Sequence, residues 1–135
     1  MVKLMAVVPA EGDLPLCRFF QGLEDKQRRK LLTLFLMLMR APAAVMREPY
    51  VKHFTLERYQ SLYELRAKSK ILVRIIFCRG GKGELLLLTP FIKHSRRDTM
   101  QALEAALAQK AAVEEGTCSV RELSIEFFRQ GGAVL

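Results

Sequence analysis

The alternation of hydrophobic and polar positions divides the first part of the chain into one strand and two helices. Residues 1–8 alternate loosely, are rich in valine and end at the breaker cluster 9–13, which predicts a first strand. Residues 14–23 and 24–40 have helical spacing, and the second segment carries acidic residues in its first turn and Arg40 in its last. Its C-terminal half is apolar on nearly every side, so we expect it to be covered on more than one face.

After a connector at 41–49, the period changes from helical to strand-like. Residues 53–59 and 62–68 are polar on one side, whereas 71–77 and 84–92 are almost continuous apolar runs, typical of central strands. Turns are expected at 69–70 and 79–83.

The last third of the chain predicts another helix at 99–115, with Asp98 as its candidate cap and apolar residues at spacings of three and four. Residues 120–130 are a possible short helix, followed by a flexible end at 131–135. The order of elements is typical of an α+β fold. We expect one domain over residues 1–116 and a C-terminal extension over 117–135.

Composition and charge narrow the range of functions. The chain has 135 residues, of which 50% are hydrophobic, which is enough for one real core. Residues 47–97 contain twelve Lys or Arg and four Glu, so this stretch carries the whole net charge of +8. Such a concentration favours an acidic partner such as RNA. Solubilising charges scattered over the surface are the alternative.

Metal binding and membrane insertion are not expected. Cys17, Cys78 and Cys118 are far apart and form no pair with zinc-binding spacing, which indicates reduced, buried thiols and no metal. The longest apolar run, 31–39, is less than half of the ~20 residues that a membrane span needs. The N-terminus lacks the pattern of a secretory signal. We therefore expect a cytoplasmic protein without a membrane contact.

Arg74 is the sharpest candidate for anion binding, because it interrupts an apolar strand. An unpaired cation there would be costly, so its guanidinium must meet an acid, carbonyl groups, water or a ligand. A salt bridge to Glu64 or Glu84 is the structural alternative. Arg66 and Lys68 alternate on the preceding strand, where a solvated polar face explains them equally well.

The register between these two strands decides whether their arginines can act together. If the connecting loop has two residues, Ser69 and Lys70, Arg66 lies opposite Val73 and Arg74 faces the other side of the sheet. An odd-length loop or a bulge places Arg66 and Arg74 together. A joint site requires this second arrangement or a strong twist.

A second cluster, Lys93, His94, Arg96 and Arg97, lies where a strand gives way to a helix. Backbone N–H groups at the start of that helix are expected to add to an anion site. His94 can exchange a proton near neutral pH, although a lone exposed histidine often has no special role.

Two residues at a strand start complete the candidates. His53 is a second residue suited to acid or base work, with the same alternative as His94. Its neighbour Lys52 is placed to contact phosphate.

Five short blocks of sequence, in this order, resemble the RelE/ParE superfamily of toxin–antitoxin toxins, specifically its phage-derived, HigB-like branch. They are "PLCRFFQGLEDKQRRKLL", "EPYVKHF", "LYELR" with the following "VRIIF", "LLLLTPFIKHSRRD" and "TMQALEAALA". The resemblance spans roughly residues 14–109. It implies a RelE-like fold: a small, twisted, antiparallel-rich sheet with two N-terminal helices on one side, a C-terminal helix and a basic concave surface.

The resemblance also implies an activity and partners. Members are similar in cleaving mRNA on the ribosome without a metal or other cofactor, by attack of a ribose 2′-OH on the adjacent phosphate. A cognate antitoxin, expected to be a helix-turn-helix protein, holds the toxin inactive, and operator DNA is contacted only through that antitoxin.

The candidate site residues follow from that chemistry, which needs a base, a proton donor and fixed cations. The resemblance places a catalytic arginine at the position of Arg74. The expected catalytic residues are Arg74, Arg66, Lys93 and His94. The expected RNA-binding residues are Lys52, His53, Lys68, Arg96 and Arg97.

The chain also departs from the pattern of its relatives. Some members carry a tyrosine in or just before the last helix, whereas this chain has none after Tyr63. His94 stands where lysine is common. Two alternatives to the nuclease therefore stay open: a catalytically silent module of the same fold that binds nucleic acid or a partner, and a ParE-like gyrase poison.

Overall fold

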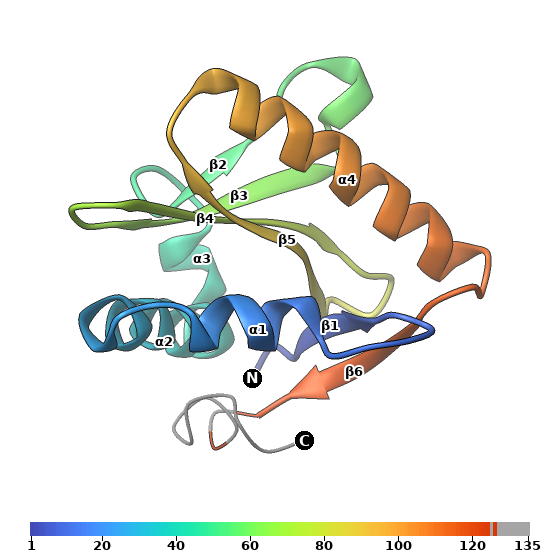
Figure 1. Ribbon diagram of the computed structural model, residues 1–135, viewed down its shortest axis with the longest axis horizontal. Helices are drawn as coiled ribbons and strands as arrows, with labels where there is room; N and C mark the ends of the chain where they lie inside the picture. The colour runs from blue at the N-terminus through green and yellow to red at the C-terminus, as the bar shows by residue number, and fades with distance from the viewer. Residues whose placement is uncertain (125, 127–135) are drawn as a thin grey trace.

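The computed structural model describes residues 1–124 and 126 of the chain. Its helices and strands form one sheet with helices on both faces (Figure 1). The strands are β1 (Leu4–Val8), β2 (Val51–His53), β3 (Leu62–Lys68), β4 (Leu72–Arg79), β5 (Leu85–Lys93) and β6 (Ser119–Leu123). The helices are α1 (Pro15–Gln21), α2 (Asp25–Arg40), α3 (Pro42–Val45) and α4 (Arg96–Glu114), with a short 3-10 helix at Glu57–Tyr59.

The sheet has the strand order β2-β3-β4-β5-β1-β6. Neighbouring strands are antiparallel except β1 and β5, which run parallel. A bulge between Ile76 and Phe77 shifts the register of β4 against β5. The antiparallel-rich sheet and its helices confirm the predicted α+β class and agree with a RelE-like fold.

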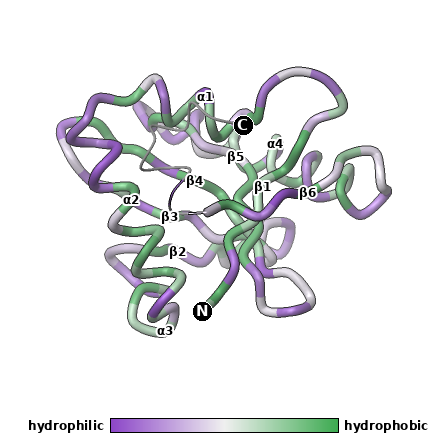
Figure 2. Tube along the Cα trace, turned by 90° about the horizontal axis from the view of Figure 1, so that it is seen from below, coloured by the Kyte–Doolittle hydropathy of each residue, from purple (hydrophilic) through white to green (hydrophobic). Residues whose placement is uncertain are grey.

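Two hydrophobic cores lie on the two faces of this sheet. On one face, Leu65, Ile75 and Phe77 pack with buried residues of α1, α2 and α3. On the other face, Ile76 and Leu88 pack with residues of α4. Figure 2 shows hydrophobic segments in the central strands and a hydrophilic stretch along β6. The long apolar runs thus belong to strands that are covered on both sides.

Local sequence signals set the ends of the two long helices. Glu24 caps α2, with its backbone N–H donating to Gln27 Oε1 at 3.0 Å. Helix α4 begins at Arg96, three residues earlier than predicted, because Ser95 is its N-cap and Asp98 is the third helical residue. The Asp98 Oδ2 atom accepts hydrogen bonds from the backbone N–H groups of His94 and Ser95 at 2.8 and 3.0 Å. Arg96 and Arg97 therefore lie in the first turn of the helix.

Three expectations about the connections were wrong. The connector 41–49 contains the short helix α3, which Pro42 begins. The strand expected at 53–59 ends at His53, and the polar residues that follow form the 3-10 helix. The helix expected at 120–130 is strand β6 over its first residues, because β6 pairs with the open edge of β1. Residues 125 and 127–130 of that prediction, and the flexible end at 131–135, lie outside the described residues.

Buried thiols are confirmed for two of the three cysteines. Cys17 and Cys78 are buried, Cys118 is partly exposed, and all three are free. Burial raises the pKa of the Cys17 and Cys78 thiols above the ordinary value. Among the described residues, no helix combines the length and apolar character that crossing a membrane requires.

An exposed ion pair ties the 3-10 helix to α4. The Glu104 carboxylate accepts hydrogen bonds from Nε and Nη2 of Arg58 at 2.8 and 2.6 Å, and another from the Tyr59 hydroxyl. Arg58 first, and Tyr59 second, lower the pKa of Glu104 to about 2. The same contacts raise the pKa values of Arg58 and Tyr59. The loop between β2 and β3 is thereby held on the helix.

We predict that the contacts of Glu104 with Arg58 and Tyr59 make part of the free energy of unfolding depend on pH in the acid range. Its contribution is present above the ordinary pKa of 4.5 and is lost as the pH falls toward the folded value of about 2, because the unfolded chain binds the proton first. Urea unfolding from pH 6 to pH 2 should show that wild type exceeds Glu104→Gln in stability at pH 6 and that the difference shrinks below 4.5. Glu115→Gln, at the end of the same helix, is the control. A difference that stays constant across this range would contradict the role of the Glu104 carboxylate.

Candidate nucleic-acid interface

Five of the predicted site residues lie on one face of the sheet. Arg66 is directly opposite Arg74, and the flanking pairs in the same ladders have the same parity. This is the face on which Ile76, two residues from Arg74, packs against α4. We call these five residues the cationic face. They are Lys52 of β2, Arg66 and Lys68 of β3, Arg74 of β4 and Lys93 of β5.

The loop between β3 and β4 produces this arrangement. It has three residues, 69–71, and both the backbone N–H and the hydroxyl of Ser69 donate to the Ile71 carbonyl, at 3.2 and 2.9 Å. An odd number of loop residues places Arg66 opposite Arg74, the arrangement that a joint site requires. The two-residue alternative, with Arg66 opposite Val73, does not occur.

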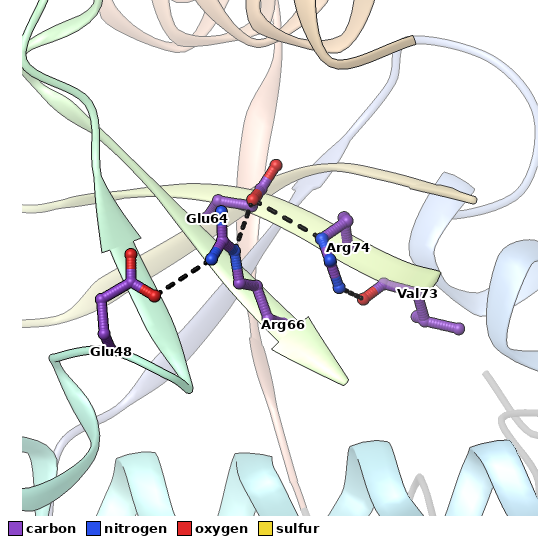
Figure 3. A network of polar contacts seen from close by, with 5 residues as sticks. All are labelled: Glu48, Glu64, Arg66, Val73 and Arg74. Carbon is purple, nitrogen blue, oxygen red and sulfur yellow. Dashed lines mark hydrogen bonds and ion pairs between the residues drawn. The ribbon is translucent and has the colours of Figure 1, made fainter. Parts of the chain in front are cut away.

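A buried carboxylate lies between the two arginines (Figure 3). Glu64 Oε1 is 2.9 Å from Nε of Arg66 and 3.6 Å from Nε of Arg74. The Glu64 side chain is 1% exposed, and those of Arg74 and Arg66 are 9% and 22% exposed. Nη1 of Arg66 also contacts Glu48 Oε2 at 3.0 Å, and Nη1 of Arg74 donates to the Val73 carbonyl at 3.3 Å.

This network resolves the alternatives for Arg74. Its acidic partner is Glu64, whereas Glu84 turns toward the β4–β5 turn and accepts a hydrogen bond from the Lys82 backbone N–H at 3.0 Å. The salt bridge is therefore real, but one carboxylate serves two guanidinium groups. The second carboxylate on Arg66, from Glu48, has a side chain that is 64% exposed, so water competes for it.

Burial and neighbouring charges act in opposite directions on Arg74. Burial lowers the pKa of the Arg74 guanidinium, the Glu64 carboxylate raises it, and the neighbouring Arg66 lowers it again. An arginine still keeps its charge at neutral pH. Nε of Arg74 and Oε2 of Glu64 are buried without a hydrogen-bond partner, which is costly.

A pocket of about 630 Å³ opens beside the arginine pair. Its wall includes the cationic residues of the β3–β4 hairpin, the linker before β2 and one stripe of α2. Its volume is in the range of small-molecule and nucleotide sites. The lining residues are Lys30, Thr33, Leu34, Met37, Pro49, Tyr50, Arg66, Lys68, Leu72 and Arg74.

The structure does not bring the other predicted residues to the arginine pair. His53 follows Lys52 on β2, so its side chain points to the opposite face of the sheet. His94, Arg96 and Arg97 are exposed at the junction of β5 and α4, next to Lys93 in the chain. Among the described residues, no hydrogen bond or ion pair joins them to Arg66 or Arg74.

The helix start is a weaker anion site than predicted. The backbone N–H groups of His94 and Ser95 already donate to Asp98, and these two bonds lower the pKa of its carboxyl. An incoming anion would have to displace this internal carboxylate. The described part of the chain also contains no group of three or more metal-ligating side chains.

Sequence reasoning missed three parts of the site. Glu48 gave no signal beyond its position before Pro49, and Lys30 and Met37 gave none, because their approach depends on how α2 packs. Glu64 was not missed: it was expected on the strand face of Arg66 and as a possible partner of Arg74. Its alternation with Arg66 on one strand is the signal that identifies it as a partner of both.

The fold and the cationic face together define a small α+β protein, consistent with a RelE-like fold, that presents five basic side chains on one face of its sheet. Residues 18–112 match the family described as Phage derived protein Gp49-like (DUF891), which is more than two thirds of the chain. The chain belongs to this family, which is associated with RelE-like toxins. No curated protein matches the chain.

We predict that Glu64 contributes strongly to stability. Glu64→Gln removes the shared negative charge and leaves two arginines facing each other, so the free energy of unfolding should fall by about 3 kcal/mol. Chemical denaturation measures this change. Glu48→Gln removes the exposed carboxylate from the same Arg66 and is the matched control, with an expected effect below about 1 kcal/mol. Equal effects of the two substitutions would contradict the central position of Glu64.

Proposed function

We propose that this protein is the toxin of a type II toxin–antitoxin system, a ribosome-dependent, metal-independent mRNA endoribonuclease of the HigB-like branch of the RelE/ParE superfamily. One observation carries the proposal. Arg66 and Arg74 face each other across one buried carboxylate, on a sheet face that also presents three lysines. Membership of the Gp49-like family supports the same direction.

The arginine pair suits the charge that develops in RNA cleavage. In the proposed step, the ribose 2′-oxygen bonds to phosphorus and the bond to the 5′-oxygen breaks, which leaves a cyclic phosphate and a 5′-hydroxyl. The phosphorane intermediate carries extra negative charge on its oxygens, and fixed guanidinium groups stabilise that charge. Glu64 contacts both Nε atoms, and Glu48 and the Val73 carbonyl contact the Nη1 atoms, so within the described residues Nη2 of each arginine remains for phosphate.

Proton transfer needs a different group. His94 follows Lys93 of the cationic face, is exposed and has a ring suited to accept or donate a proton near neutral pH. We propose that His94 accepts the proton of the 2′-hydroxyl and that Lys93, its neighbour in the chain, donates a proton to the leaving 5′-oxygen. Arg96 and Arg97 extend the positive charge along the first turn of α4 and would contact flanking phosphates.

The proposed protein partner is a cognate antitoxin, a helix-turn-helix protein through which the complex reaches operator DNA. The contact between Glu48 and Arg66 supports an antitoxin that binds through an acidic segment, because a carboxylate from outside the sheet already reaches Arg66. Such a segment would compete with RNA for the cationic face.

A catalytically silent RNA-binding module of the same fold is the second candidate. Two observations favour it: both arginines already pair with carboxylates, and the chain has no tyrosine after Tyr63. Binding would then use the same cationic face without cleavage.

We predict that Arg74→Ala abolishes cleavage. In a ribosome assay with programmed mRNA, read by primer extension, the rate should fall by about 100-fold or more, the typical loss when one donor to a developing oxyanion is removed. Lys70→Ala, an exposed cation of the loop between β3 and β4 that is not one of the five residues of the cationic face, is the control and should cleave like wild type. Thermal unfolding checks that the Arg74 variant is folded.

The same assay separates the candidates. Wild-type protein that binds ribosomes or RNA but never cuts is the silent module. Trapped gyrase in a supercoiling assay, with intact mRNA, would indicate a ParE-like poison and end the nuclease proposal.

We also predict a steep salt dependence of RNA binding. For single strands, the logarithm of the affinity falls with a slope of about −0.7 per phosphate neutralised. Lys93→Ala and Arg66→Ala should each make the slope shallower by about 0.7, whereas Lys70→Ala should not. Fluorescence anisotropy between low and physiological salt measures this slope. An RNA affinity that does not change with salt concentration would rule out the cationic face as the binding surface.

A further inference from the structure

Three aromatic rings form a ladder on the sheet face opposite the cationic face. The ring centroids of His53 and Tyr63 are 4.5 Å apart with planes at 18°, and those of Tyr63 and Phe77 are 5.4 Å apart at 21°. The register pairs His53 with Tyr63 and Tyr63 with Phe77, so the ladder crosses β2, β3 and β4. It begins at the fully buried Phe77 and ends at the exposed His53.

The last ring of this ladder is held in place and has an open side. Its Nε2 atom is 2.6 Å from the Gln60 carbonyl oxygen, so the ring donates a hydrogen bond there. The Arg79 guanidinium lies 5.3 Å from the centre of the Tyr63 ring and helps to fix that ring. Because β2 is the first strand of the sheet, no further strand covers the outward face of the His53 imidazole.

A fixed, exposed aromatic face is suited to stack on an unpaired base. Single-stranded RNA is recognised by stacking of splayed bases on aromatic rings, including histidine, and every base has a suitable face. A ring that is already oriented loses little freedom on binding. The neighbouring Lys52 points to the cationic face, so one strand of RNA that passes the β2 edge meets a cation on one side and a ring on the other.

We propose that the outward face of His53 is a stacking platform for one nucleobase of a single-stranded RNA whose backbone lies on the cationic face. This inference rests on the proposed RNA binding and adds a second binding site to it, on the opposite face of the sheet. The platform is not selective for a base, because its Nε2 donor is used by Gln60.

The test compares two RNAs of equal length, one with all bases and one with abasic nucleotides, by fluorescence anisotropy. His53→Ala should weaken binding of the base-containing RNA roughly 5- to 100-fold, the range for loss of one aromatic–base stack. His53→Phe keeps a ring and should bind within about twofold of wild type. On abasic RNA, His53→Ala and wild type should be equal. If the alanine variant does not fold, His53→Leu takes its place, because a leucine side chain still covers Tyr63 but has no aromatic ring.

Arg66→Ala is the matched variant for the backbone and should weaken binding of both RNAs. If Arg66→Ala weakens binding but neither ring-deleting variant does, stacking is overturned while RNA binding stands. A His53→Phe protein as weak as His53→Ala also overturns stacking. If wild type binds neither RNA at low salt, the proposed function fails together with the platform.

Discussion

The shared carboxylate of Glu64 constrains the rest of the site. Two guanidinium groups on adjacent strands repel each other, and a buried carboxylate alone would be costly, so the three groups are tolerable in the sheet only together. Their meeting depends on the three-residue loop at 69–71, because a shift of one residue would turn Arg66 toward the core under α2. A local turn thus decides where the charge of the whole chain is concentrated.

The helices leave part of the cationic face uncovered. Helices α1, α2 and α3 cover one face of the sheet, whereas α4 packs on part of the other face, against Ile76 and Leu88. The pocket of about 630 Å³ lies at the β3–β4 hairpin, where Arg66 and Arg74 and residues of α2 both line it. The α4 face of the sheet therefore supplies a core near Ile76 and carries the cationic residues nearer the hairpin.

The spacing of hydrophobic residues predicted both ends of β3 and placed the ends of the two long helices to within three residues. The apolar patterns of these elements are strong, and the helix caps are formed by nearby residues. The short α3 and the strand β6 were missed, because α3 is a single turn and β6 exists only through pairing with β1. Residue type alone identified Arg66 and Arg74 as site candidates. The length of the loop between them, and the placement of Lys52 and His53 on opposite faces of the sheet, became known only from the strand register. The expectations about catalysis, the antitoxin and the boundary at 116 stay predictions.

A site built from two arginines and one buried carboxylate can fold without a ligand, and the proposed anion would meet it already formed. With no carboxylate, repulsion would open the hairpin; with a buried carboxylate on each arginine, a phosphate would find no uncompensated charge. The exposed Glu48 fits between these limits, because it can leave Arg66 at small cost when a stronger anion arrives. In the proposed RNA complex, a preference for a single strand would follow from the edge strand β2, whose successive residues, Lys52 and His53, face both sides of the sheet. Only a flexible chain with splayed bases can contact both.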